Sequence, residues 1–137
     1  GNRLGEHYCR RWVALGVLKE LNKNQKSGKG NKLVIRAQVS KYIGSENEYL
    51  CISIARHMGP TPNVNSSVTL GLLVNKDLRK KVTFLNDLSI KTREVNSTCE
   101  RCPAENCKDR VAESFVINNL NAKEKVKGAL SNLESSL

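Results

Sequence analysis

Apolar residues recur along this chain at two kinds of spacing, and each kind predicts a type of element. Val13, Val17 and Leu21 recur every four residues within residues 10–22, which predicts an amphipathic helix. Residues 33–40 and 49–56 alternate apolar with polar side chains, which predicts two half-buried strands. The turn-forming residues between these stretches predict that the two strands form a β-hairpin.

The stretches between these elements are polar or rich in glycine and proline. We therefore expect loops over residues 22–31 and 57–65. Residues 68–74 alternate again and predict a third strand, and residues 76–81 predict a short helix. Three apolar residues that follow it are expected to enter the core: Val82, Phe84 and Leu85.

The last part of the chain differs in composition from the rest. From Asn118 onward it is rich in Asn, Lys, Glu and Ser, with leucines at loose helical spacing, which predicts an amphipathic helical tail. We accordingly predict a domain over residues 1–117 and a tail over residues 118–137. The expected fold is α+β, a small antiparallel sheet with helices packed on one face and a cysteine knuckle near the C-terminus.

Three cysteines within nine residues form the densest chemical signal in the chain. Cys99, Cys102 and Cys107 have the spacing C-x2-C-x4-C, in which two thiolates flank a short turn and a third can close the same pocket. The alternatives are a disulfide or free structural thiols, but three cysteines cannot all pair among themselves. The spacing therefore favours a metal ion or cluster whose fourth ligand comes from elsewhere.

Cys9 is the candidate for that fourth ligand. It lies just before the first predicted helix, where partial positive charge favours the thiolate, and its neighbours are polar. His7 is the main rival, because zinc accepts histidine as readily as cysteine; the alternative role for Cys9 is a small buried residue beside Trp12. Cys51 lies between two apolar residues of a predicted strand and is interpreted as a core thiol. The spacing does not distinguish zinc from an iron–sulfur cluster.

The amino-acid composition indicates which kinds of molecule this protein is expected to bind. The 137 residues carry 23 Lys and Arg against 13 Asp and Glu, a net charge of +10 that attracts anionic ligands. The basic residues are dispersed and aromatic residues make up only 4%, so a base-stacking nucleic-acid surface is not favoured. We find no apolar run of membrane-spanning length and no signal peptide, which leads us to expect a cytoplasmic protein without membrane attachment. Because the sequence begins at Gly1 rather than Met, we interpret it as a fragment of a longer protein.

The cysteine pattern together with Arg110, C-x2-C-x4-C-x2-R, resembles the C-terminal knuckle of the short-chain fatty acyl-CoA regulator family. The segments Cys9-Arg10-Arg11-Trp12, Ile52-Ser53-Ile54-Ala55-Arg56 and Leu70-Gly71-Leu72 resemble further blocks of that family, in the same order. Members of this family are bacterial transcription regulators with an N-terminal helix-turn-helix and a C-terminal sensor domain. The resemblance implies an effector-sensing domain that binds an acyl-CoA-like ligand, associates as a homo-oligomer such as a dimer, and reaches DNA only through an N-terminal domain outside this sequence. It also implies that the cysteine site holds a redox-active cluster in some members.

Basic residues near the predicted strand ends are candidate contacts for a small anionic ligand. Arg56 ends a strand, and Arg79 and Lys80 follow the third strand; if the strands are neighbours, these groups would flank one mouth of the sheet and suit a diphosphate. The alternative is ordinary solvated surface charge. We recognise no nucleophile motif, phosphate loop or metalloprotease helix, so we expect no enzymatic activity. The alternative function is a zinc-stabilised protein-interaction module without a small-molecule ligand.

Overall fold

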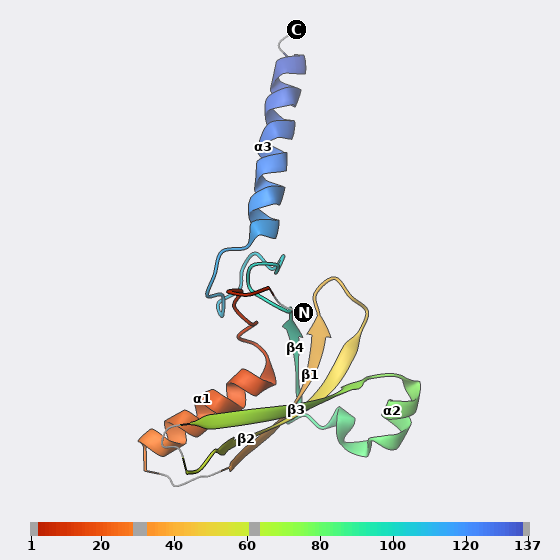
Figure 1. Cartoon of the computed structure of the whole chain (residues 1–137). Helices are drawn as coiled ribbons and strands as arrows, with labels where there is room; N and C mark the ends of the chain where they lie inside the picture. The colour runs from red at the N-terminus through yellow and green to blue at the C-terminus, as the bar shows by residue number, and fades with distance from the viewer. Residues whose placement is uncertain (1–2, 29–32, 61–63, 136–137) are drawn as a thin grey trace. The chain divides into compact units, whose positions relative to one another are not determined.

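The computed structural model of this chain describes residues 3–28, 33–60 and 64–135. Its helices are α1 (Val13–Lys26), α2 (Lys76–Lys81), a 3-10 turn η1 (Thr83–Asn86) and α3 (Phe115–Ser135). Its strands are β1 (Leu33–Tyr42), β2 (Glu48–His57), β3 (Asn65–Leu73) and β4 (Lys91–Val95) (Figure 1). The predicted α+β class is confirmed.

The four strands form one sheet in the order β3-β2-β1-β4. The predicted hairpin is confirmed, with β1 and β2 antiparallel from the pair Leu33–Arg56 to the pair Lys41–Glu48, and β3 antiparallel to the outer side of β2. The sheet is nevertheless mixed, not purely antiparallel as predicted, because β4 pairs in parallel with β1. Between β1 and β4 the chain passes through β2, β3, α2 and η1. Strand β4 then forms the edge of the sheet next to β1 and runs in the same direction as β1.

Helix α1 covers one face of the sheet. Its four-residue repeat of Val13, Val17 and Leu21 is buried against Val34 of β1 and Ala55 of β2. The helix continues to Lys26, so the predicted loop beginning at residue 22 is wrong over its first residues. Nothing in those polar residues breaks a helix, and the turn comes only at Ser27 and Gly28. Residues 29–31 of that predicted loop and residues 61–63 of the second loop lie outside the described residues.

The segment of α2 and η1 covers part of the opposite face. Val39 and Leu50 are buried there with Leu85 of η1, and α2 adds Leu78 beside them. Helical segments therefore pack on both faces, which corrects the expectation of helices on one face only. Of the apolar residues after α2, Leu85 enters the core as predicted, but Phe84 is 48% exposed.

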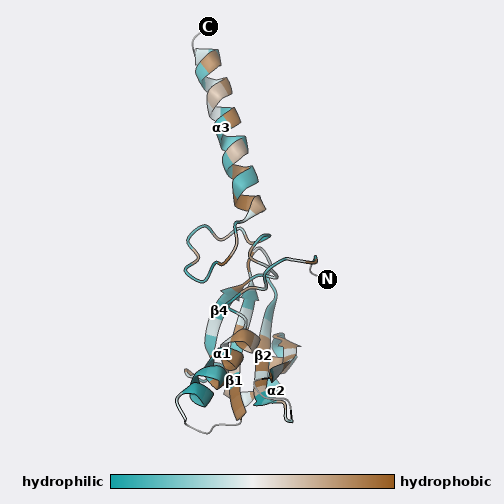
Figure 2. Ribbon diagram, turned by 60° about the vertical axis from the view of Figure 1, so that its left-hand side comes forward, coloured by the Kyte–Doolittle hydropathy of each residue, from teal (hydrophilic) through white to brown (hydrophobic). Residues whose placement is uncertain are grey.

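The chain divides into two compact units. Unit 1 comprises residues 1–9 and 96–137, and unit 2 comprises residues 10–95, which hold the sheet. The predicted boundary between residues 117 and 118 falls inside α3, which begins at Phe115. Among the described residues of α3 none is buried, and Figure 2 shows apolar and polar residues interspersed along it. None of the helices in the described ranges combines the length and the apolar character needed to cross a bilayer.

Candidate metal centre

Unit 1 brings the N-terminal segment beside the cysteine knuckle. Tyr8 and Thr98 form an isolated antiparallel bridge. On either side of it, the N–H of Cys9 donates to the carbonyl of Ser97 over 3.2 Å, and the N–H of Cys99 donates to the carbonyl of His7 over 2.9 Å. Cys9 therefore lies opposite Ser97, and Cys99 lies opposite His7. The segment that carries Cys9 runs alongside the segment that carries Cys99, although about 90 positions of sequence separate them.

An ion pair and a histidine–carboxylate hydrogen bond reinforce this contact. The guanidinium of Arg101 binds the carboxylate of Glu6 over 2.6 Å, and the imidazole Nδ1 of His7 lies 2.7 Å from the carboxylate of Glu100. The backbone N–H of His7 also donates to both oxygens of Glu100, over 3.0 Å each. These hydrogen bonds lower the pKa of Glu100, with the side chain of His7 as the largest contribution.

The knuckle itself consists of two short turns. The N–H of Cys102 donates to the carbonyl of Cys99 over 3.2 Å, which closes the C-x2-C turn, and the N–H of Arg110 donates to the carbonyl of Cys107 over 3.2 Å. The guanidinium of Arg110 then reaches back and donates to the carbonyls of Cys99 and Cys102, over 2.9 and 3.3 Å, and to that of Ala104. A single cationic side chain therefore fixes the backbone that carries the first two knuckle cysteines.

Ser114 joins the knuckle to α3. Its hydroxyl donates to the carbonyl of Cys102 over 2.8 Å and accepts from the N–H of Ile117 over 3.3 Å. The second bond is the usual contact of a helix N-cap, which satisfies one of the free N–H groups of the first turn. Ser114 is buried, so this link lies inside unit 1 rather than on its surface.

The predicted metal ligands all lie in unit 1. Cys9, Cys99 and Cys102 are buried, Cys107 is half-buried, and none of the four forms a disulfide. Thiolates in such a setting are suitable ligands for zinc or a cluster. Within the described residues, however, no three or more His, Cys, Asp or Glu side chains are arranged so as to hold a metal ion. Metal binding by these cysteines, and the choice of Cys9 or His7 as fourth ligand, stay predictions.

Cys51 belongs to unit 2, whereas the four predicted metal ligands belong to unit 1. It is half-buried on β2 and packs against the cluster under α1.

The three predicted anion contacts do not lie together. Arg79 of α2 binds the carboxylate of Glu48 over 3.1 Å, and Glu48 is the first residue of β2. Arg56 is the ninth residue of that strand, so about 26 Å of extended chain separates it from Glu48. The expectation that Arg56, Arg79 and Lys80 flank one mouth of the sheet is therefore wrong. Whether any one of them contacts a ligand stays a prediction.

Sequence reasoning did not assign roles to Glu100 and Ser114. The signal for Ser114 is local, because a serine directly before the apolar run Phe115-Val116-Ile117 is a typical helix N-cap. The partnership of Glu100 with His7 has no local signal, because 93 positions separate the two residues. Comparisons with protein-family models, with curated proteins and with solved structures find no match to this chain.

Proposed function

We propose that this chain is the effector-sensing domain of a bacterial transcription regulator, and that its unit 1 binds a metal ion or cluster through Cys9, Cys99, Cys102 and Cys107. DNA would be contacted by a separate helix-turn-helix domain, as in the family that the sequence resembles. The metal would act as a staple that joins the N-terminal segment to the knuckle, or as a redox-sensitive element if it is an iron–sulfur cluster.

The observation that carries the metal part of the proposal is the position of Cys9. The bridge between Tyr8 and Thr98 holds the segment that carries Cys9 alongside the segment that carries Cys99, and the Arg101–Glu6 ion pair joins the same two segments. Arg110 and Ser114 bond the carbonyl of Cys102. Zinc would be bound by sulfur at about 2.3 Å, and affinity for it would add directly to the stability of unit 1.

Metal content provides the first test. Protein purified in air should contain about one zinc per chain if the site is a zinc staple. Protein purified without oxygen should instead contain iron and sulfide, with visible absorbance, if the site holds a cluster. Protein that is folded but free of both metals after anaerobic purification would contradict the proposal.

An acyl-CoA-like ligand is the proposed effector, supported by the family resemblance and by the charge of +10. Calorimetry of the metal-loaded protein against short acyl-CoA esters should show saturable binding. Arg56 lies near one end of β2, and Arg79 is bound to Glu48 at the other end. Reversing the charge of each should therefore change the affinity for the ester unequally. Whichever of Arg56→Glu and Arg79→Glu weakens binding more marks the end of the sheet where the phosphates of the ester bind. Absence of both heat and thermal shift with folded, metal-loaded protein would exclude this effector class.

A second function, a zinc-stabilised protein-interaction module, is favoured by a different observation. The sheet face that α2 covers only in part exposes apolar side chains from three neighbouring strands. They are Leu33, Ile35, Ile54, Val68 and Leu70. An apolar surface of this kind is typical of contact sites between proteins. A metal-loaded protein that binds no acyl-CoA ester would leave this function as the better account.

A further inference from the structure

Two adjoining cavities lie on the sheet face that carries α1, within unit 2. Their volumes are about 550 and 410 Å³, and both are lined by Tyr42, Cys51 and Gly71. Because they share these three residues, the two cavities adjoin, and together they are called the hollow below. Each volume by itself falls within the usual range for small-molecule sites.

The hollow arises from small side chains on three adjacent strands. Gly71 of β3 pairs with Cys51 of β2, and Thr69 pairs with Ser53 in the same register. Ser40 of β1 points to the same face, because side chains two positions apart share a face and Ser40 pairs with Tyr49. The side chains on this part of the sheet are therefore small, and they leave space between the sheet and the start of α1.

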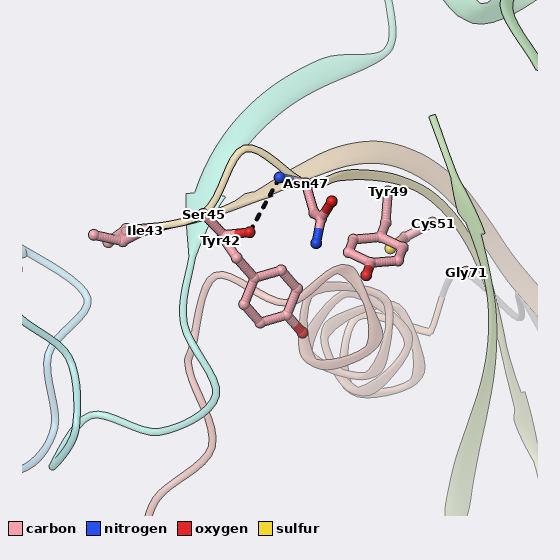
Figure 3. A pocket seen from close by; sticks show the side chains of 7 residues that line it. All are labelled: Tyr42, Ile43, Ser45, Asn47, Tyr49, Cys51 and Gly71. Carbon is pink, nitrogen blue, oxygen red and sulfur yellow. Dashed lines mark hydrogen bonds between the residues drawn. The ribbon is translucent and has the colours of Figure 1, made fainter. Parts of the chain in front are cut away.

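Large aromatic residues line the sides of this hollow. The rings of Tyr42 and Tyr49 meet edge to face, with centroids 5.9 Å apart and planes at 84°. Figure 3 shows the rings of Tyr42 and Tyr49 with Asn47 of the β1–β2 turn near them, Cys51 beside Tyr49, and Gly71 on the neighbouring strand. Trp12, which precedes α1, lines the second cavity. The turn is held in place by Gly44, whose φ of 79° favours glycine.

The lining is uncharged, which is unusual for this chain. Among the described residues that line the two cavities none has a formal charge, although 26% of the whole sequence is charged. What lines them is aromatic rings, aliphatic groups, one thiol and several hydroxyls. An uncharged, flat molecule can stack on such rings and hydrogen-bond at the hydroxyls, whereas an ion would lose its hydration without gaining an opposite charge.

We propose that this hollow, here called the tyrosine pocket and defined by Tyr42, Tyr49, Cys51 and Gly71, binds an uncharged planar aromatic molecule with one hydrogen-bonding substituent. The site is separate from the cysteine knuckle, which lies in unit 1, and from Arg56, Arg79 and Lys80, none of which lines it. It does not depend on the metal or on acyl-CoA binding.

Gly71 allows a direct test. A Cβ placed on Gly71 meets no atom within 4 Å, so a side chain there would enter the hollow without a clash. Valine is also a better strand former than glycine. The variant Gly71→Val should therefore fold and fill the pocket, and Gly71→Ala provides a smaller filling should the valine variant fail to fold. Val68→Ile is the matched control, because Val68 lies on the opposite face of β3 and is 74% exposed.

The probes are phenol, indole and benzamide, with benzoate as the charged counterpart of benzamide. Binding is followed by NMR chemical shifts of the backbone amides around Gly71, at physiological ionic strength. Wild type and Val68→Ile should bind at least one neutral probe with a dissociation constant on the order of 1 mM, as expected for such small ligands. Gly71→Val should abolish binding, Gly71→Ala should weaken it, and benzoate should bind at least about tenfold more weakly than benzamide.

Three results would overturn the proposal. The first is the absence of shifts near Gly71 with all three neutral probes at millimolar concentration. The second is binding to folded Gly71→Val, or to Gly71→Ala if valine prevents folding, that equals binding to wild type. The third is benzoate binding as tight as that of benzamide, which would indicate attraction to the basic surface rather than an uncharged pocket.

Discussion

The guanidinium of Arg110 donates a hydrogen bond to the carbonyl of Cys99 over 2.9 Å, across 11 positions of sequence. The same group bonds the carbonyls of Cys102, Ala104 and Ala112, so one side chain joins four backbone acceptors in and after the tight turns of the knuckle. Arg110 thus joins the two turns of the knuckle to each other.

Replacing Arg110 should therefore destabilise unit 1. Hydrogen bonds from charged donors contribute about 1.5–3 kcal/mol each at partly buried sites, and the contributions of bonds from one side chain are not additive. We expect Arg110→Ala to lower the free energy of unfolding by about 2 kcal/mol, measured by urea titration followed by circular dichroism. Lys108→Ala removes a nearby exposed cation and should change stability by less than about 0.5 kcal/mol. Equal midpoints for the two variants would contradict this role of Arg110.

The cysteine variants separate metal ligands from other thiols. Cys99→Ser should reduce the metal content of the purified protein and remove most of the stabilisation that added zinc provides, because affinity for a structural metal is folding energy. Cys51→Ser is the matched control, since Cys51 lies in unit 2, and it should retain the metal content of wild type. Metal content is measured by elemental analysis. A Cys99→Ser protein with full metal content would exclude Cys99 from the ligand set.

Acid stability should depend on Glu100. Its pKa lies below the ordinary value of 4.5 because His7 hydrogen-bonds its ionised carboxylate, so the folded state binds the proton less readily than the unfolded state. This stabilisation is complete above the ordinary value and is lost as the pH falls through the lowered one. Wild type should therefore lose more stability than Glu100→Gln between neutral pH and about pH 3.

The measurement is the melting temperature across that range in the presence of a chelator, which removes the separate effect of thiolate protonation on metal binding. Glu105→Gln, a change at an exposed carboxylate in the same unit, serves as the control. Identical acid profiles for wild type and Glu100→Gln would show that the His7 contact does not contribute.

The core under α2 and η1 should depend on Leu50. This side chain is fully buried between Val39 and Leu85, so Leu50→Ala removes its contacts and leaves a cavity. We expect a loss of about 3 kcal/mol in the free energy of unfolding. Leu88→Ala deletes the same atoms from a leucine that is 99% exposed, and it should cost less than about 0.5 kcal/mol. A small effect of Leu50→Ala would mean that this face of the sheet is not a true core.

Some features of the fold were predictable because their signals are local. The repeat of Val13, Val17 and Leu21 is the repeat that α1 buries, and the alternation in residues 33–40 and 49–56 is that of β1 and β2. Strand β4 was not predicted, since it is short, carries three charged residues and buries only Val95. Its pairing with β1 is a long-range contact, which no pattern within five residues specifies.

For the candidate sites, the sequence by itself determined which residues are candidates for metal binding. Thiols at C-x2-C-x4-C spacing favour a metal wherever the chain folds, because the spacing sets the turn between them. Only the tertiary structure decided which distant groups meet. It placed the segment of Cys9 alongside that of Cys99, and it paired Arg79 with Glu48, at the end of β2 that is distant from Arg56. It also aligned the small residues of three strands in the tyrosine pocket. The reason is that these relationships depend on strand pairing and register, which are set by the packing of the whole sheet rather than by any local stretch of the chain.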